Sequence, residues 1–303
     1  MSVLLVGIDE NGMGPQLGPL VVTGVLARAT VEGARWLRRE SLAALPHLDD
    51  SKKLVSFQKP WLAEAWARVM FPGARRPDDI VEGASLLPRR ELRALCPPHV
   101  EAQCWGAGGA FEAPSDLVEA VRCDVEKLQE REVEMWEVRS VYLCTSRLHE
   151  ERAAGRTLTT SDLRAMERLI LALRERGGGP IDAVCGKVGG LNRYLSHLGP
   201  LRDFPVAVEE EGRARSSYRF AGVGSVAFVR DADGSDPLVA LASLVGKYLR
   251  EVLMGKIANH HLRLDPSLPR PSGYRDPVTG RFVQATAERR RLMLLPDRCF
   301  LRP

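Results

Sequence analysis

The most constraining feature of the sequence lies near its beginning, where a β-branched run ends in two adjacent acids and a glycine-rich turn. Residues 3–8 form the run, Asp9 and Glu10 follow it, and the turn covers residues 12–19. A second apolar run, residues 20–27, begins directly after the turn. Two runs of β-formers joined by glycine and proline predict a β-hairpin. We therefore expect a sheet that begins with this hairpin and carries two carboxylates at the end of its first strand.

The rest of the chain alternates helical and extended patterns without an internal repeat. Its 303 residues, of which 45% are hydrophobic and 27% charged, can bury the core of one large domain. Interspersed helices and strands predict a mixed α/β fold. We expect one domain over residues 1–260, with an irregular insertion at about 71–114 that is rich in Pro, Gly and Arg, and a C-terminal tail, 261–303, that packs on it.

Hydrophobic periodicity predicts the individual elements. Helical spacing is found at 31–45, 57–69, 117–136, 161–174 and 237–254. Extended runs are found at 138–145, 181–188, 204–209 and 217–229, and glycines divide the last of these into a hairpin.

Composition excludes several classes of protein. Six cysteines without a C-x-x-C pair argue against a zinc ribbon or a disulfide framework. The N-terminus has no basic region before its apolar run, and no apolar stretch approaches the roughly 20 residues that span a bilayer. A net charge of +4 permits a polyanionic partner without requiring one. We expect a cytoplasmic monomer that does not contact a membrane.

The acidic turn has two interpretations. Asp9 and Glu10 place negative charge beside backbone amides of a turn that contains Gly12, Gly14 and Gly18. This combination suits a hard divalent cation and an approaching phosphate, because magnesium takes few protein carboxylates and keeps water and substrate oxygens. Alternatively, the turn is solvated and its glycines only provide positive φ angles.

A second acidic segment precedes the helix predicted at 237–254. Asp231 and Asp233 have the same parity on a strand that is ending, so both side chains are expected on one face. Asp236 stands directly before Pro237 and is either a further acidic ligand or a helix cap. Small residues on one stripe of the helix, such as Ser243, predict close packing against the sheet, although such a stripe is also typical of ordinary core.

These segments together resemble the family of type 2 ribonucleases H, ribonucleases HII and HIII. GIDENGMGP is similar to the family's first signature, an Asp-Glu pair followed by a glycine turn. ADGSDPLVALASLVGKYLRE is similar to its later signature, and the loop Asp50-Ser51-Lys52-Lys53-Leu54 matches a third motif in the same order. The resemblance implies a ribonuclease H-like fold with a mixed β-sheet flanked by helices, binding of RNA/DNA hybrid, and hydrolysis with Mg²⁺ or Mn²⁺ that leaves 5′-phosphate ends.

The resemblance also implies roles for individual residues. Asp9, Glu10 and Asp233 would be catalytic metal ligands, around two ions about 4 Å apart that activate water and stabilise the leaving 3′ oxygen. Asp231 or Asp236 would assist them. Cationic and hydroxyl groups would position the nucleic-acid backbone without reading sequence. The nucleic-acid-binding set would be Gly12, Met13, Gly14, Ser51, Lys52, Lys53, Lys187, Ser243, Lys247 and Tyr274.

The sequence departs from the family pattern at two positions. Gly186 stands where the family has a further metal-binding Asp at the end of a central strand. Asp182 lies four residues earlier, about 13 Å away along an extended strand, so we expect it to be structural. Met13 stands where the glycine turn normally has a basic residue. These departures leave two main hypotheses: an endonuclease with a reduced set of carboxylates, or a catalytically impaired protein that binds nucleic acid. A third is a nuclease of the same fold that acts on a related nucleic acid, such as a DNA junction.

Overall fold

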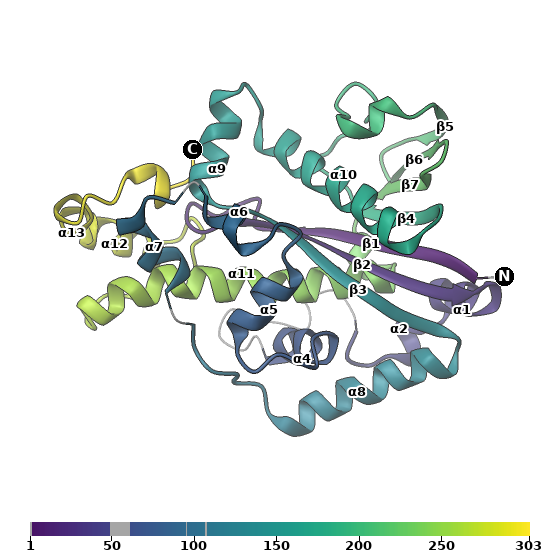
Figure 1. The fold of residues 1–303 in the computed structure, drawn as a ribbon, viewed down its shortest axis with the longest axis horizontal. Helices are drawn as coiled ribbons and strands as arrows, with labels where there is room; N and C mark the ends of the chain where they lie inside the picture. Colours follow the sequence, from purple (N-terminus) through teal and green to yellow (C-terminus); the bar gives the residue numbers. More distant parts are fainter. Residues whose placement is uncertain (1, 49–60, 95, 107) are drawn as a thin grey trace.

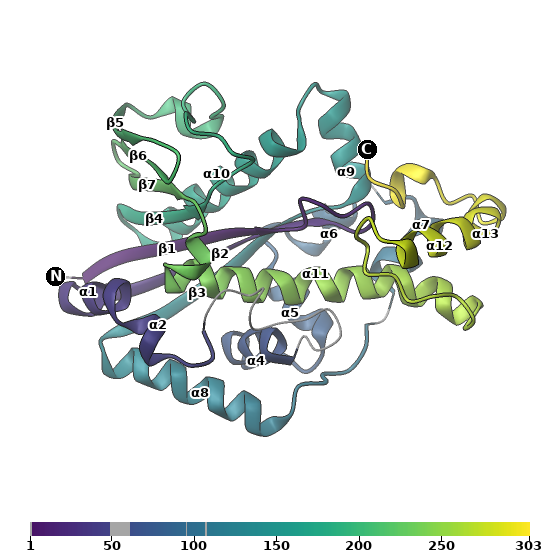
Figure 2. The same cartoon turned by 180° about the vertical axis from the view of Figure 1, so that it is seen from behind.

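The computed structural model describes residues 2–48, 61–94, 96–106 and 108–303, and these form a seven-stranded sheet between two layers of helices (Figures 1 and 2). The strands lie in the order β3-β2-β1-β4-β7-β6-β5. Their bounds are β1 Ser2–Asn11, β2 Leu20–Thr30, β3 Val133–Leu143, β4 Ile181–Gly186, β5 Val206–Glu211, β6 Arg215–Phe220 and β7 Gly224–Val229.

The sheet is mixed, as the sequence predicts. β2 is antiparallel to both β1 and β3, whereas β1, β4 and β7 are mutually parallel at the centre. β6 and β5 extend the sheet in antiparallel fashion beyond β7. In the parallel register Ile8 lies opposite Cys185. Asp9 and Gly186 are the next residues of these two strands, so the acidic end of β1 and the end of β4 meet at one edge of the sheet.

Helices cover both faces of the sheet (Figures 1 and 2). One face packs against α10 (Leu158–Gly177), with α9 (Thr145–Ala153) before it in the chain, and the other face packs mainly against α11 (Pro237–Leu264). The second face is also covered by α4 (Trp61–Met70), α5 (Pro77–Ala84) and α8 (Ser115–Glu130). The remaining helices are α1 Val31–Arg39, α2 Ser41–Ala44, α6 Arg89–Arg93, α7 Pro98–Trp105, α12 Pro277–Ala285 and α13 Ala287–Leu292.

Glycines allow α11 to approach β1 very closely. A Cβ atom added to Gly7 of β1 would lie 2.2 Å from the carbonyl carbon of Leu238. A Cβ atom added to Gly246 of α11 would lie 2.6 Å from the side-chain amide nitrogen of Asn11. Because α11 comes this near to β1, its polar residues lie within reach of the acids of β1. The helix therefore packs closely against the sheet.

Several predicted elements need correction. The segment 71–114 is not wholly irregular, because it contains α5, α6 and α7. Residues 133–136, predicted as helix, belong to β3, since β-branched Val133 starts the strand after α8 has ended. Helix α9 was not predicted, and α11 continues ten residues beyond 254, to Leu264. The added length of α11 packs against the insertion, where the ammonium of Lys256 donates to the carbonyl oxygen of Gly106 at 2.7 Å.

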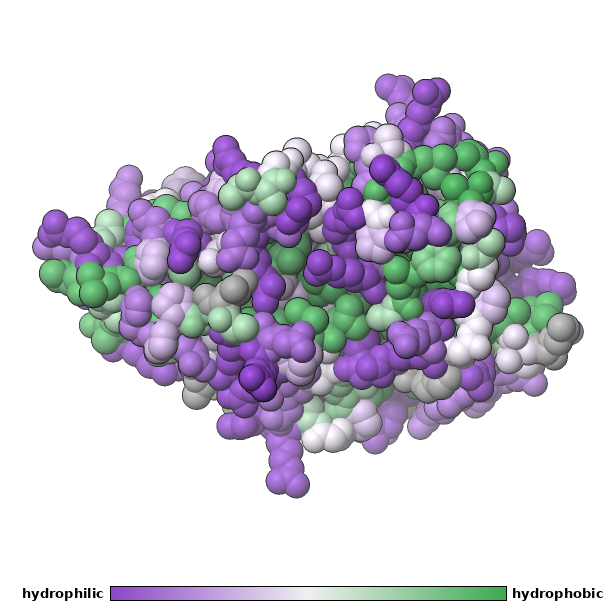
Figure 3. Space-filling model, turned by 45° about the horizontal axis from the view of Figure 1, so that its top comes forward, coloured by the Kyte–Doolittle hydropathy of each residue, from purple (hydrophilic) through white to green (hydrophobic). Residues whose placement is uncertain are grey.

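The surface is mostly hydrophilic. Figure 3 shows a face on which charged and polar side chains surround smaller apolar patches in the middle and at the right. Val206 and Val208 on the edge strand β5 are 39% and 50% exposed. Within the described part of the chain, no helix combines the length and the apolar character needed to cross a bilayer.

The contact between β1 and α11 can be tested with one glycine substitution. We expect Gly7→Ala to lower the free energy of unfolding by about 3 kcal/mol, because the added methyl meets backbone atoms that cannot move aside. Urea denaturation measures the change. Gly255→Ala on α11 is the control, since a Cβ there meets no atom within 4 Å. That variant should gain about 0.5 to 1 kcal/mol, and equal stability of the two variants would contradict the packing described.

Candidate active site

A cavity of about 420 Å³ lies where the ends of β1 and β4 meet α11. Its walls come from five parts of the chain: β1 and its turn, the end of β4, the segment after β7, α11 and the C-terminal tail. The predicted site residues that line it are Asp9, Glu10, Gly12, Met13, Lys187, Asp233, Ser243, Lys247 and Tyr274. Gly14 lies just outside, and a Cβ atom there would be 3.9 Å from the ring of Tyr274. Ser51, Lys52 and Lys53 lie outside the described residues.

Asp9 is the electrostatic centre of this cavity. Burial raises the pKa of its carboxyl well above the ordinary value, and the charges of Glu10 and Asp233 raise it further. A hydrogen bond from the Ser243 side chain acts in the opposite direction. Ser243 reaches Asp9 because α11 packs so closely on β1, and its carbonyl oxygen accepts the side-chain amide of Asn11 at 3.2 Å. The site therefore concentrates negative charge at a place with little water.

Two of the three acids before α11 line the cavity. Strand β7 ends at Val229, and Asp231 takes a left-handed conformation with φ of 52°, so the strand that was predicted to carry Asp231 and Asp233 on one face is absent. Asp231 nevertheless lines the cavity, with an exposed side chain that pairs with Arg230 at 3.5 Å. Asp233, in the following 3-10 turn, is 8% exposed and lines the cavity. Asp236 does not line the cavity and instead caps α11.

The capping carboxylate of Asp236 is itself buried. It accepts the backbone N–H groups of Leu238 at 3.0 Å and Val239 at 3.1 Å. These bonds satisfy amides that the first turn of a helix otherwise leaves unpaired. Burial nevertheless raises the pKa of Asp236 to about 6. Of the two interpretations of Asp236, the helix cap is the one that this geometry supports.

Gly186 faces the acids. A Cβ atom added to it would lie 2.6 Å from Oδ1 of Asp9 and 3.6 Å from Oε2 of Glu10. A side chain at this position would collide with the carboxylate of Asp9 unless that carboxylate moved, so the absence of a side chain at Gly186 leaves the space to Asp9. Asp182, four residues earlier, accepts the hydroxyl of Ser225 at 3.0 Å and pairs with Arg38. It is occupied at the opposite end of β4, as expected of a structural residue.

The acids suit a divalent cation by their chemistry, although they do not form a closed ligand shell. Carboxylate oxygens are hard donors that Mg²⁺ and Mn²⁺ prefer. Among the described residues, no three Asp, Glu, His or Cys side chains are close enough together to hold a metal ion. Magnesium needs only one or two protein carboxylates, with water and substrate phosphate as its other ligands. The excess of buried negative charge around Asp9 therefore fits a cation that is held by few protein ligands.

The glycine turn is held by the last residues of the chain, which the sequence did not reveal. Gly12 has φ of 110°, and its carbonyl oxygen accepts a hydrogen bond from Arg302. The Nε–H group of Arg302 also donates to the carbonyl oxygen of Gly18 at 2.8 Å. No local sequence pattern predicts that Arg302 binds two backbone carbonyls. The turn thus depends on residues about 290 positions away in the chain.

Tyr274 comes to the cavity together with an arginine of α11. The guanidinium of Arg250 lies 4.6 Å from the centre of the Tyr274 ring. Arg250 is buried, with 1% of its surface exposed. The N–H groups of Gln16 and Leu17 donate to the carbonyl oxygen of Gly273, which ties this loop to the turn after β1. Tyr274 therefore lies beside the glycine turn, and Arg250 is a further cavity residue.

Lys187 stabilises the loop after β4 through hydrogen bonds. Its ammonium donates to Oδ1 of Asn192 at 3.0 Å and to the carbonyl oxygen of Arg213 at 2.9 Å. Desolvation lowers the pKa of this ammonium. The side chain lines the cavity but has its donors directed at the loop and at the β5–β6 connection. Met13 also lines the cavity, and it packs against the core cluster beneath α10.

Comparison with known proteins shows likeness in structure. No protein-family model matches the sequence, and no curated protein matches it significantly. The chain is similar to RNase HII from Archaeoglobus fulgidus, solved in complex with PCNA, with a TM-score of 0.48, 18% identity, and coverage of 99% of this chain and 94% of that chain. It is also similar to Bst-RNase HIII in complex with Mn²⁺, with a TM-score of 0.45 and 13% identity.

That second similarity covers 99% of this chain but only 66% of the other, so the chain spans just under two thirds of Bst-RNase HIII. A third similar structure is Aquifex aeolicus RNase H3, with a TM-score of 0.46, 13% identity, and coverage of 98% and 70% of the two chains. Each of these three similarities covers nearly the whole of this chain.

The buried cap of α11 predicts a specific dependence of stability on pH. The pKa of Asp236 rises from 3.8 to about 6 on folding, so its contribution to stability is fully present below pH 4 and is lost as the pH rises through 6. Asp236→Asn keeps a capping oxygen without a charge. We expect it to match wild type at pH 4 in urea denaturation and to exceed it at pH 7 by about 2 to 3 kcal/mol.

Asp236→Ala distinguishes the effect of the capping oxygen on stability from the effect of the charge. This variant loses the capping oxygen and should be less stable than Asp236→Asn by about 1 kcal/mol at both pH values. Parallel stability curves for wild type and Asp236→Asn between pH 4 and 7 would show that the burial of this charge has no effect.

Proposed function

We propose that the chain is a metal-dependent endonuclease that hydrolyses RNA in RNA/DNA hybrids. The observation that carries this proposal is the convergence of its motif residues in one cavity. Asp9 and Glu10 come from β1, Asp233 from the segment after β7, and Lys247 from α11, yet all line the same space of about 420 Å³. Segments that are separated by more than two hundred residues and that together resemble a nuclease signature converge on one acidic centre.

The cavity combines the two kinds of group that the reaction needs. Asp9, Glu10 and Asp233 would hold Mg²⁺ or Mn²⁺, which when bound supplies an activated water and stabilises charge on the leaving oxygen. Lys247 and Arg250 of α11 also line the cavity and would attract the phosphate backbone. Ser243 would orient the Asp9 carboxyl through their hydrogen bond. The partly exposed ring of Tyr274 offers a flat apolar surface at the rim to a sugar or base.

The glycine turn would allow the substrate backbone to approach the acids closely. Gly12 has positive φ, and a Cβ atom there would lie within about 3.2 Å of both Arg250 and Arg302. Any side chain would push these two arginines away from the turn. The backbone of this turn lies directly beside Asp9 and Glu10, so a sugar-phosphate chain held against it would present its phosphodiester to the acids.

Cleavage of a labelled RNA/DNA hybrid tests this proposal. Wild type with Mg²⁺ or Mn²⁺ should cut the RNA strand and leave 5′-phosphate ends. Asp9→Asn should reduce the rate by about 100-fold or more, because a metal-bound charge stabilises the transition state by several kcal/mol. Asp182→Asn, which removes a carboxylate at the far end of β4, should cut like wild type. No cleavage by wild type, beside a control enzyme that cuts the same hybrid, would refute the nuclease activity.

A second candidate function is a nucleic-acid-binding protein with impaired catalysis. The specific observation that favours it is Gly186, which leaves the end of β4 without a carboxylate beside Asp9. Tight binding of hybrid at low salt without cleavage would support this candidate. Phosphate contacts by Lys247 and Arg250 should then make the affinity fall steeply as salt increases. Absence of binding at low salt would eliminate it.

A further inference from the structure

A second cavity, of about 300 Å³, lies against the start of α10 and is lined by three arginines. Arg164 and Arg168 belong to α10, and Arg156 lies two residues before the helix begins. Because residues four apart share one face of a helix, Arg164 and Arg168 project from the same side of α10. Among the described residues, none that lines this cavity also lines the one that contains Asp9. The arginine cavity is therefore a separate concentration of positive charge.

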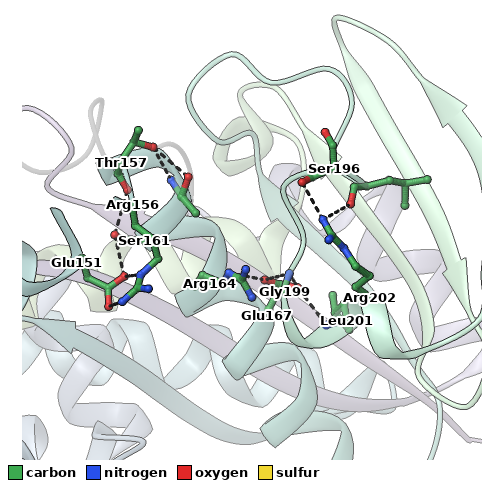
Figure 4. A network of polar contacts seen from close by, with 12 residues as sticks. Glu151, Arg156, Thr157, Ser161, Arg164, Glu167, Ser196, Gly199, Leu201 and Arg202 are labelled. Atoms are coloured by element: carbon green, nitrogen blue, oxygen red, sulfur yellow. Dashed lines mark hydrogen bonds and ion pairs between the residues drawn. The ribbon is translucent and has the colours of Figure 1, made fainter. Parts of the chain in front are cut away.

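Glu151 is the only carboxylate among the described residues that line the arginine cavity, and it is already bound. Arg156 donates two N–H groups to it, one of them at 2.9 Å, and the hydroxyl of Ser161 donates to it at 3.2 Å (Figure 4). The hydrogen bond from Arg156 is the main cause of a pKa below the ordinary value for Glu151. Arg156 therefore balances the charge of this carboxylate, and the charges of Arg164 and Arg168 remain for a ligand.

Arg164 is held in place but keeps donor capacity. Figure 4 shows it between the Glu151 network and Glu167. Its Nε atom lies 3.9 Å from Glu167, and it is buried without a hydrogen-bond partner among the described residues. The oxygens of Glu167 instead accept the N–H groups of Gly199 at 2.7 Å and Leu201 at 3.1 Å. A Cβ atom at Gly199 would lie 1.0 Å from Nη1 of Arg164, so the glycine provides the space for this guanidinium.

Arg168 adds a second guanidinium that is open to solvent. Its side chain is exposed, and no ion pair is found for it in the described part of the chain. A planar guanidinium fork matches the geometry of phosphate oxygens, and two neighbouring forks can hold one phosphate group from two sides. The chemistry of the arginine cavity therefore favours a phosphate as its ligand.

The sheet places the arginine cavity beside the acidic one. Leu143, which lines the arginine cavity, pairs with Leu20 at the start of β2. Asn11, which lines the acidic cavity, pairs with the next residue, Val21. Because neighbouring strands are about 4.8 Å apart, the backbones of Leu143 and Asn11 are about 10 Å apart across β2. The two cavities therefore lie at the same edge of the sheet, one on the α10 face and the other on the α11 face.

A nucleic-acid duplex in the acidic cavity would also extend across this edge. Duplex DNA carries one negative charge per about 1.7 Å of its axis, so a span of about 10 Å contains several phosphates. We propose that Arg164 and Arg168 bind a phosphate of the duplex away from the position of cleavage. The inference rests on the proposed function for its substrate class and adds a backbone contact on the α10 face of the sheet. Such a contact positions the duplex without reading its sequence.

Binding of a labelled RNA/DNA hybrid to the metal-free full-length protein, measured by fluorescence anisotropy over a range of salt concentrations, tests the inference. The double variant with Arg164→Gln and Arg168→Gln should bind about tenfold more weakly at low salt. The slope of log affinity against log salt should become shallower by about 2, because each lost phosphate contact removes about 0.9. Arg168→Gln alone should change this slope by about 1. It is the variant to use if the double variant does not fold, since Arg168 is exposed.

Arg176→Gln is the matched control. It removes the same charge from α10, but at the far end of the helix, where Arg176 pairs with Glu137 at 2.7 Å. Eight residues of helix, about 12 Å, separate it from Arg168. This exceeds the Debye length of about 10 Å at 0.1 M salt. The control should therefore bind hybrid like wild type. If Arg168→Gln and the double variant also keep the affinity and the salt slope of wild type, the inference is overturned.

The remaining outcomes distinguish this inference from the nuclease activity. Hybrid binding that depends on the two arginines, by a wild type that does not cut, supports the inference and refutes the nuclease. Where wild type does cut, the variants should raise KM and leave kcat unchanged. Absence of hybrid binding by wild type at low salt overturns the inference. So does a calorimetric titration in which inorganic phosphate binding depends on Arg164 and Arg168 while hybrid binding does not, because the cavity would then take a free phosphate.

Discussion

Negative charge buried at the crossing of β1 with its flanking helices is the constraint on which the rest of this structure depends. Asp9 and Asp162 are both carboxylates in an interior that disfavours their ionised form, and burial raises the pKa of each. A protein core normally excludes such groups or pairs them. Keeping them costs stability, and the proposed divalent cation beside Asp9 would offset part of that cost.

The surrounding fold holds polar groups beside this charge and restricts their movement. Gly7 and Gly246 let α11 lie against β1, which places Ser243 on Asp9. On the other face, the capped and hydrogen-bonded start of α10 holds Asp162 in position. The C-terminal Arg302 ties down the glycine turn that borders the cavity. Distant parts of the chain therefore meet at one point, as expected of a site that must be preorganised.

Much of this arrangement could be predicted from the sequence. Short-range patterns predicted the hairpin of β1 and β2, the central strand β4 and the helix after Asp236, because each is encoded by local periodicity and turn residues. The order of the motifs predicted that Asp9, Glu10 and Asp233 would share a region, and all three line the cavity. The sequence also indicated that Gly186 stands in place of a carboxylate. In the structure, a side chain at this position would meet Asp9.

The rest could not be predicted, for physical reasons. Asp162 lies in an ordinary amphipathic helix, and only the packing of α10 on the sheet shows that it is buried. Arg302 binds backbone carbonyls, which leave no trace in the pattern of side chains. Asp231 and Asp233 both line the cavity, but the strand that was predicted to carry them ends at Val229, and Asp231 itself takes a left-handed conformation. Each of these features depends on tertiary contacts or on one backbone angle.

The most direct test of the account is an anomalous diffraction map from crystals of the protein soaked in Mn²⁺. We predict a peak in the cavity beside Asp9, with carboxylate oxygens of Asp9 and of Glu10 or Asp233 as ligands. A map without a peak in this cavity, or with a manganese ion that contacts none of these three carboxylates, would contradict the proposed metal site.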